Sequence, residues 1–370
     1  MKRQTSFIFI LLTSFLLSGC GSDGVQFFNP SKTVDIESKK VTKENKNAQA
    51  GPVQEKILKA PEKIIPVKPE VKLSEKLVKY CSLMDSKFEM YGWGKSNCEQ
   101  YDWHHVRNSY LGRPLIWKSW GEETDVEKKN VTLIMCGVHG DEITPIKFCF
   151  DVIRSIDQMV YDPNSPFDIK NKMIVVAPLV APDSFFKKLP TRTNHKGVDV
   201  NRNFPTKDWD ADALRLWKTR YRSDKRRYPG KRPLSEQETV FQVNLIKRYS
   251  PDKIISVHAP LTILDYDGPA KHGEDKHEHA ANQLLIQMSK DASGYRIKNY
   301  PFFPGSLGNW AGNERGIPTY TLELPSSDNR KHREYWNLFS KAIYSAINRD
   351  MSNGLNVADK EGKPASGNKL

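Results

Sequence analysis

Four separated segments of the chain carry the residue types that metal-assisted hydrolysis of an amide requires. Together they supply two histidines, a glutamate that could complete a metal site, guanidinium groups and a further carboxylate. The segments are 139–142 (His-Gly-Asp-Glu), 201–203 (Asn-Arg-Asn), 256–258 (Ser-Val-His) and 321–324 (Thr-Leu-Glu-Leu). Each is weak evidence alone, but their order and their position at the ends of predicted strands indicate one hydrolytic site.

Three of these residues are suited to hold one metal ion. His139 and Glu142 are three residues apart, so both can face the ion where the chain turns into a helix. His258, from another strand, completes a set of three ligands with an open fourth position. A lone His-x-x-Glu is usually coincidental and a lone histidine is more often structural, so the hypothesis depends on their joint occurrence.

The pattern of apolar residues predicts alternating strands and helices. A Ser at 235 and a Glu at 238 have the spacing of a capping box at the start of one helix. This alternation favours an α/β fold, with a mostly parallel, twisted, mixed sheet and helices on both faces. In such folds sites gather at the carboxyl ends of strands. The predicted strands are 131–136, 173–177, 253–257 and 318–324, and the predicted helices are 143–159, 235–249, 278–289 and 332–349.

The N-terminus indicates export. Lys2 and Arg3 precede an apolar run, 7–17, which has the length of a secretory signal and is too short to span a membrane. Residues 17–20 (Leu-Ser-Gly-Cys) resemble a bacterial lipobox, in which cleavage leaves Cys20 as a lipid-modified first residue. We therefore predict a lipoprotein anchored in the cell envelope and facing the periplasm, with the outer membrane favoured over the inner. An ordinary signal with a chance cysteine is the alternative.

Composition divides the chain into four parts. Residues 1–19 are the predicted lipoprotein signal peptide, and 20–75 are rich in Lys, Glu, Val and Pro, as expected of a disordered tether. Residues 76–350 are long enough for a single catalytic domain with an N-terminal extension. Residues 351–370 form a predicted flexible tail.

Four cysteines remain beside Cys20. In an oxidising compartment Cys81 and Cys98 could form a disulfide that contributes about 3 kcal/mol by the chain-entropy model. Two free thiols are the alternative for this pair. Cys136 lies in a predicted strand and Cys149 in a predicted helix, so we expect both to be buried.

The formal net charge of +13 is concentrated in one segment. Residues 215–232, called here the basic segment, hold nine Lys and Arg against one Asp, with aromatic residues between them. Such a stretch could bind nucleic acid, but an exported protein meets little of it, so we predict no nucleic-acid partner. Anionic polymers or head groups of the envelope are better candidates, and a merely solvated loop is equally compatible.

Three other motifs carry less information. His272, His277 and His279, with two acidic neighbours, could form a second metal cluster, but their charge density favours a solvated loop. Residues 92–96 end like a phosphate-binding loop but lack its earlier glycine. The His-Glu-x-x-His motif of another class of zinc peptidases is absent from the sequence.

Several blocks resemble the zinc metallocarboxypeptidase family of carboxypeptidase A. The resemblance rests on the His-x-x-Glu motif, residues 197–204 (Gly-Val-Asp-Val-Asn-Arg-Asn-Phe), His258 and the Thr-Leu-Glu strand. It covers about residues 115–324. Further blocks resemble the murein peptide amidase branch of that family, and they are 266–270 (Tyr-Asp-Gly-Pro-Ala), 304–308 (Pro-Gly-Ser-Leu-Gly) and 321–325 (Thr-Leu-Glu-Leu-Pro).

The resemblance implies a role for each candidate residue. Carboxypeptidase A is itself a known example of catalytic zinc held by two histidines and a glutamate, which here are His139, Glu142 and His258. Glu323 matches the family's general base and Arg192 its carbonyl-polarising arginine. The two residues that match the grip on the substrate's terminal carboxylate are Asn201 and Arg202. No tyrosine lies in a block that aligns with the family's mobile tyrosine.

These expectations converge on one function and two alternatives. The resemblance implies a single zinc ion and hydrolysis of the amide between γ-D-glutamate and diaminopimelate in peptidoglycan peptides. A conventional carboxypeptidase acting on protein C-termini is the first alternative, and an inactive envelope-binding adaptor is the second. Besides peptidoglycan peptides, we expect contact with the membrane through the N-terminal lipid. The sequence does not establish the oligomeric state, and we expect a monomer.

Overall fold

The computed structural model describes residues 66–126, 129–271 and 279–351. The predicted signal peptide, Cys20, most of the predicted tether, His272, His277 and nearly all of the tail lie outside these residues. The described part of the tether, 66–74, contacts the domain, since Lys68 Nζ lies 2.6 Å from Asp157 Oδ2 and Leu73 packs against the core. Among the described residues, no helix has the length and apolar character needed to cross a membrane.

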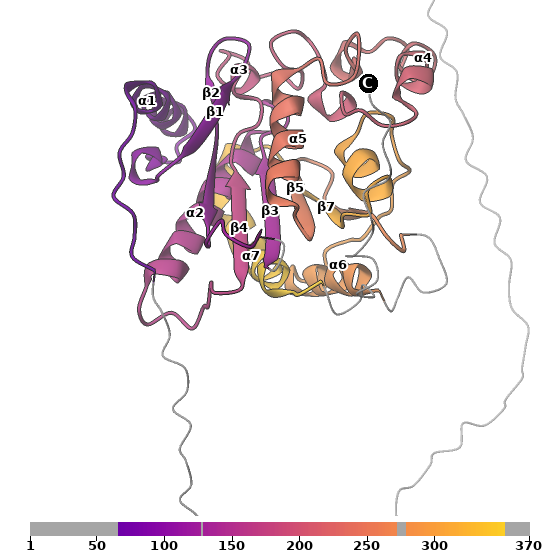
Figure 1. The fold of residues 1–370 in the computed structure, drawn as a ribbon. Helices are drawn as coiled ribbons and strands as arrows, with labels where there is room; N and C mark the ends of the chain where they lie inside the picture. Colours follow the sequence, from indigo (N-terminus) through magenta and orange to yellow (C-terminus); the bar gives the residue numbers. More distant parts are fainter. Residues whose placement is uncertain (1–65, 127–128, 272–278, 352–370) are drawn as a thin grey trace, which may run out of the picture. The chain divides into compact units, whose positions relative to one another are not determined.

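A mixed seven-stranded sheet forms the centre of the described domain, in the order β1-β2-β4-β3-β5-β7-β6 (Figure 1). Strands β4, β3, β5 and β7 run parallel, while β1, β2 and β6 join them in antiparallel pairs. The strands are β1 His104–Asn108, β2 Pro114–Trp120, β3 Asn130–Cys136, β4 Lys172–Ala177, β5 Lys253–His258, β6 Ile263–Asp267 and β7 Thr319–Glu323.

Helices cover both faces of this sheet, and each face has its own apolar core. One core contains residues of α1, α2, α6 and α7, and the other contains residues of α5. The predicted α/β class with helices on both faces is therefore confirmed. The helices are α1 Glu75–Met90, α2 Ile143–Tyr161, α3 Pro182–Phe185, α4 Leu214–Thr219, α5 Gln237–Tyr249, α6 Ala280–Asp291 and α7 His332–Asn348.

All eight predicted elements are present, and the structure adds α1, α3, α4, the β1–β2 hairpin and β6. The predicted capping box at the start of α5 is wrong. The helix begins at Gln237 after Glu236, and Ser235 Oγ donates to the Glu236 carboxylate rather than capping the helix. Glu238 accepts from the side-chain amide of Asn194 at 3.1 Å, because the helix start packs against a distant loop that the local spacing could not reveal.

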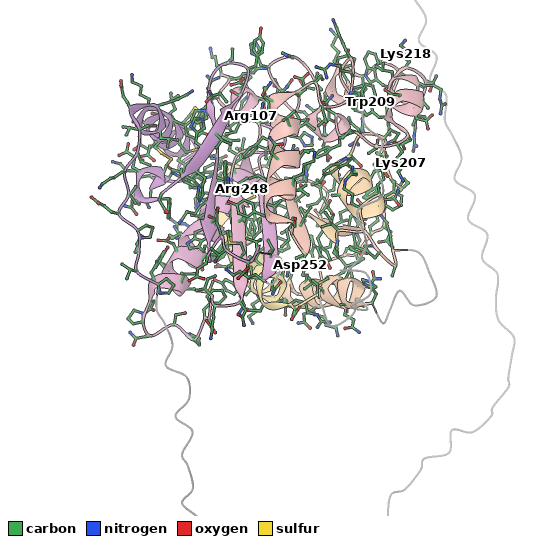
Figure 2. The ribbon with its side chains drawn as sticks, viewed as in Figure 1. Arg107, Lys207, Trp209, Lys218, Arg248 and Asp252 are labelled. Atoms are coloured by element: carbon green, nitrogen blue, oxygen red, sulfur yellow. A yellow bond between two sulfur atoms is a disulfide. The ribbon has the colours of Figure 1, made fainter. Side chains whose placement is uncertain are left out.

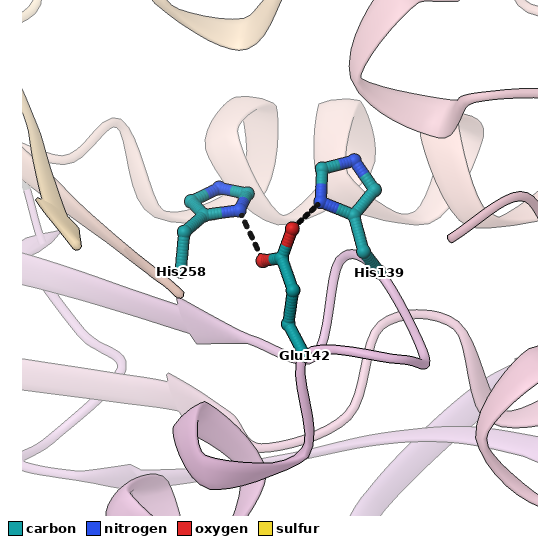
Figure 3. A group of neighbouring side chains, drawn as sticks. All are labelled: His139, Glu142 and His258. Carbon is teal, nitrogen blue, oxygen red and sulfur yellow. Dashed lines mark hydrogen bonds and ion pairs between the residues drawn. The ribbon is translucent and has the colours of Figure 1, made fainter. Parts of the chain in front are cut away.

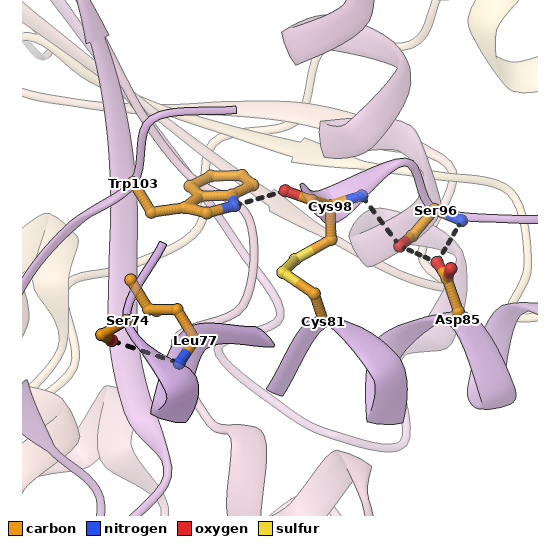
Figure 4. Close-up of a disulfide and its surroundings, with 7 residues drawn as sticks. All are labelled: Ser74, Leu77, Cys81, Asp85, Ser96, Cys98 and Trp103. Atoms are coloured by element: carbon orange, nitrogen blue, oxygen red, sulfur yellow. Dashed lines mark hydrogen bonds between the residues drawn. A yellow bond between two sulfur atoms is a disulfide. The ribbon is translucent and has the colours of Figure 1, made fainter. Parts of the chain in front are cut away.

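Two disulfides lie in the core on the α1–α2 side of the sheet. Cys81 of α1 and Cys98 are joined with an S–S distance of 1.97 Å, beside an indole of Trp103 that donates to the Cys98 carbonyl (Figure 4). Cys136 and Cys149 are both buried, as expected. They also form a disulfide that was not predicted from the sequence. The bond is possible because α2 packs against β3 and brings the two Cα atoms to 6.2 Å.

The topology places the candidate residues together. Strands β3, β5 and β7 are adjacent and parallel, so their carboxyl ends meet at one edge of the sheet. His258 ends β5 and Glu323 ends β7, and these two residues are direct cross-strand partners. His139 follows the end of β3 by three residues.

Candidate active site

His139, Glu142 and His258 form a buried group in which one ligand atom from each lies within 4.8 Å of the others. Glu142 stands between the two rings, with Oε1 2.8 Å from Nδ1 of His139 and Oε2 2.9 Å from Nδ1 of His258 (Figure 3). Within the described part of the chain this is the only such group of three or more metal-binding side chains.

The turn that carries His139 and Glu142 is held on both sides. Cys136 and Gly137 accept hydrogen bonds from Val180 and Ala181, and the Gly140 amide donates to Thr191 at 3.1 Å. A Cβ atom at Gly140 would lie 2.5 Å from the backbone nitrogen of Phe185. Only glycine therefore allows this close approach, which brings the two ligands to the end of β3.

The far nitrogen of each imidazole is also occupied. His139 Nε2 lies 3.0 Å from Asp199 Oδ1, and His258 Nε2 lies 2.9 Å from Ser256 Oγ. These contacts fix the ring orientations and direct both Nδ1 atoms toward Glu142. Asp199 is fully buried and was not singled out in the sequence, although it lies two residues before Asn201 in a block that was.

Charges in this group are balanced by neighbours. Arg192 lies 3.0 Å from Asp199 and 3.1 Å from Glu142. Burial opposes ionisation of Glu142, yet His139 and His258 hold its pKa well below 4.5. Burial likewise opposes ionisation of Asp199, but Arg192 and His139 hold the pKa of that carboxyl well below 3.8.

The group fits a zinc ion. Two imidazole nitrogens and one ionised carboxylate, each oriented by a second contact, are a common ligand set of catalytic zinc. The three side chains converge from the turn after β3, the start of α2 and the end of β5, and they line a cavity. A bound zinc ion would act there as a Lewis acid and lower the pKa of water.

Glu323 lies beside the group without joining it. Its carboxylate accepts from the Leu261 amide at 3.3 Å, and burial raises its pKa above 4.5 despite the proximity of His258. A carboxylate that is close to the metal ligands but outside their set has the position required of a general base.

Asn201 and Arg202 lie on the same cavity as the metal group. Asn201 Oδ1 accepts from the Leu307 amide at 2.8 Å, and the Arg202 guanidinium lies 4.8 Å from the ring centre of Phe303. Burial lowers the pKa of Arg202, and its Nε is buried without a hydrogen-bond partner among the described residues. A partly buried guanidinium with an unpaired donor can bind an anion that enters the cavity.

The cavity has a volume of about 740 Å³ and contains every candidate catalytic and metal-binding residue. Two residues before the His258–Glu323 pair, Ser256 of β5 pairs with Thr321 of β7, and Thr321 pairs in turn with Asp265 of β6. Asp267 lies two residues further along β6. Burial, together with Asp267, raises the pKa of Asp265 to about 6. Two tyrosines that the sequence analysis did not assign, Tyr221 and Tyr300, also line the cavity.

The basic segment contributes to the same cavity. Arg220, Arg226 and Arg227 line it, so part of this segment is neither a remote patch nor a freely solvated loop. The other basic residues of the segment do not line the cavity. One of them is Lys218, which lies on α4 (Figure 2). His279, from the second histidine cluster, instead caps α6 by accepting from the Ala281 amide at 3.2 Å.

Comparison with curated proteins finds relatives that share the name murein peptide amidase A. The chain is 28% identical over 228 residues to murein peptide amidase A of Escherichia coli strain K12, which covers 60% of this chain and 82% of that protein. It is 30% identical over 220 residues to murein peptide amidase A of Vibrio campbellii, which covers 59% of this chain and 77% of that protein.

Comparison with solved structures supports the fold. Carboxypeptidase A from Helicoverpa armigera matches with a TM-score of 0.52 and 16% identity, over 66% of this chain and 68% of that one. The model of the zinc carboxypeptidase family, Peptidase M14, matches residues 95–351. With its sheet, its His-Glu-His group and this match over most of its length, the chain belongs to the zinc carboxypeptidase family.

Proposed function

We propose that this enzyme hydrolyses the amide between γ-D-glutamate and diaminopimelate in peptidoglycan stem peptides. Two of its relatives are named murein peptide amidase A, and the blocks that resemble this branch line the cavity through Asp267, Ser306, Leu307 and Glu323. The catalytic zinc ion of the family would be held by His139, Glu142 and His258.

The charge distribution in the cavity is the observation that favours this substrate. Diaminopimelate carries an ammonium and a carboxylate at the end of its side chain, besides its own α-carboxylate. The cavity offers Arg202 for a carboxylate and Asp265 and Asp267 for an ammonium. Lys271 lies 2.5 Å from Asp267 and 3.7 Å from Asp265, so this acidic pair keeps a net negative charge when both are ionised. An apolar C-terminal residue would bring no cation to this negative charge and no carboxylate to Arg202 beyond its terminal one.

The remaining side chains fit the steps of amide hydrolysis. Glu323 would take the proton of the attacking water and pass it to the departing amine. Arg192, fixed by Asp199 and Glu142, would stabilise the negative charge that develops on the carbonyl oxygen. Asn201 and Arg202 would hold the substrate's terminal carboxylate and so position the amide.

Mass spectrometry of muropeptide digests tests this function directly. Zinc-loaded protein is expected to release diaminopimelate from stem peptides that end in it, and chelated protein is not. Metal content is measured on the same sample. Absence of release across several stem peptides, with zinc shown to be bound, would reject the substrate.

Hydrolysis of unbranched L-peptides separates the first alternative. If peptides ending in Phe or Leu were cleaved faster than the diaminopimelate peptide, a conventional carboxypeptidase would be the better description. The inactive adaptor is disfavoured because Glu323 and Arg192 are both present at the site, and a binding protein has no need of a general base.

We further propose that the protein is an envelope lipoprotein, anchored through Cys20 and facing the periplasm. The lipobox-like residues 17–20 and the polar stretch that follows them support this. Radiolabelled palmitate should be incorporated into the wild-type protein and not into the Cys20→Ala variant. Equal labelling of the two would refute lipidation at this residue.

A further inference from the structure

Three guanidiniums of the basic segment form one wall of the active-site cavity. Arg220, Arg226 and Arg227, called here the arginine rim, are the basic residues of that segment that line the cavity. The reaction steps described above use none of them. Their role in the enzyme therefore needs a separate explanation.

A backbone hydrogen bond next to the arginine rim connects the basic segment to the metal site. The Tyr228 carbonyl accepts from the Asp199 amide at 2.8 Å, and Asp199 is the residue that holds His139 and Arg192. A short 3₁₀ helix spans Lys225–Arg227, and Asp224 caps it by accepting from the Arg226 amide at 2.9 Å. The Asp224 carbonyl accepts from the Trp217 indole at 2.8 Å. The rim is thus a positioned wall rather than a solvated loop.

The rim carries more positive charge than its carboxylate neighbours balance. Arg226 Nη1 pairs with Asp141 at 2.8 Å, and Arg227 lies 3.6 Å from Asp224. Arg220 has no carboxylate within ion-pair distance among the described residues, and its guanidinium lies over the ring of Tyr221. Both pairs are substantially exposed, since the side chains of Arg226 and Arg227 are 60% and 43% accessible. Exposed pairs contribute little stability, so a ligand can compete with them.

The location of these charges identifies the part of a substrate that they face. Asp141, the partner of Arg226, lies between His139 and Glu142 in the chain, so Arg226 adjoins the metal turn. Its ion pair uses one terminal nitrogen, and a guanidinium has further N–H donors. The Arg226 guanidinium therefore lies beside a ligand at the metal group, and the terminal carboxylate, which is assigned to Arg202, does not use it.

The proposed substrate has an anionic group in that region. D-Glutamate that is linked through its γ-carbonyl keeps its α-carboxylate free, a short carbon chain away from the scissile carbonyl. We propose that the arginine rim binds this carboxylate, with Arg226 as its main contact, and so selects substrates that are anionic on the acyl side of the amide. Planar, bidentate guanidinium groups suit this task better than lysine. This inference rests on the proposed function.

A matched pair of peptides tests it. L-Ala-γ-D-Glu-diaminopimelate is compared with the same tripeptide in which the D-Glu α-carboxylate is an amide. One charge-assisted hydrogen-bonded contact predicts that wild-type kcat/KM is about 10-fold to 100-fold higher for the acid. Arg226→Gln should remove most of this preference, and a triple Arg→Gln variant at 220, 226 and 227 should abolish it. Lys218→Gln removes a charge from the same segment outside the cavity. This variant should keep the wild-type preference for the acid.

A binding measurement separates failure of this inference from failure of the proposed function. Calorimetry on zinc-loaded Glu323→Gln protein, with the rim intact or carrying Arg226→Gln, gives Kd for both peptides without turnover. Equal hydrolysis or equal binding of acid and amide by the intact rim would overturn the inference alone. Rim-dependent binding of the acid without any hydrolysis by the wild type would overturn the proposed function alone. A preference that survives the triple variant would also refute the assignment to the rim.

Discussion

The metal site and the arginine rim line the same cavity but differ in how their charged groups are neutralised. At the metal site the ionisable groups are buried and each contacts a group of opposite character, as in the chain from Arg192 through Asp199 to His139. At the rim the guanidiniums are exposed, and their two carboxylate partners hold them weakly. The first arrangement fixes geometry, whereas the second leaves charge available to a ligand.

This difference follows from desolvation. Buried charges are costly unless they are paired and hydrogen-bonded, so a buried ion site must be satisfied by the protein itself. Exposed guanidiniums keep their hydration and exchange partners at little cost. We therefore assign chemistry to the buried group and substrate selection to the exposed one. Substitutions, pH and salt should therefore act differently on the two regions.

Glu323→Gln should reduce kcat by about 10²-fold to 10⁴-fold, because glutamine cannot take a proton from water. Glutamine keeps an oxygen that can accept from the Leu261 amide, so zinc content and the unfolding transition should not change. Steady-state kinetics with metal analysis measures this. Glu334→Gln makes the same change on the outer surface of α7 and serves as the control. Wild-type kcat in Glu323→Gln would show that Glu323 is not the base.

Glu238 tests the rule that a buried carboxylate stays ionised only beside a cation. It is 1% exposed, and burial, with Asp183 and Glu236 nearby, raises its pKa from 4.5 to about 7. The folded state therefore holds more protons than the unfolded state between these values, and Glu238 makes stability fall as pH rises from about 4.5 to 7.

Glu238→Gln should remove that fall. From pH 4 to pH 8 the unfolding free energy of the variant relative to wild type should rise by up to about 3 kcal/mol. Urea unfolding at the two pH values measures it. Parallel pH profiles for the two proteins would mean that Glu238 is paired or solvated after all.

Asp199→Asn should weaken zinc binding by about 10-fold to 100-fold, because Asp199 orients His139 and balances Arg192. Competition with a chelator measures the affinity. Asp224→Asn makes the same chemical change at the exposed rim and should leave zinc affinity near wild type. If both variants lost zinc equally, the distinction between the two regions would not hold.

Salt should act on the rim more than on the metal site. Raising the ionic strength from 0.1 M to 1 M shortens the Debye length from about 10 Å to 3 Å. The preference for the acidic peptide over its amide should shrink several-fold through KM, while kcat and zinc content stay constant. Salt that changes the two peptides equally would argue against direct contact with the carboxylate.

Much of the fold was predictable from the chain because its signals are local. Apolar runs marked β3, β4, β5 and β7, and helical spacing marked α2 and α7. The short hairpin β1–β2 and the edge strand β6 have weaker patterns and form through pairing with neighbours. The capping box failed for a related reason, since Glu238 is held by Asn194 from a distant loop.

The amino-acid sequence alone shows which residue types are available for the chemistry. It also places His139, His258 and Glu323 at or just beyond strand ends, with Glu142 three residues after His139. Residue type and periodicity are properties of the chain, so they can be read without coordinates. The folded structure was needed to show that Asp199 orients His139, that Cys136 pairs with Cys149, and that part of the basic segment lines the cavity. These contacts join residues whose proximity depends on how helices and loops pack on the sheet, and no local pattern encodes that.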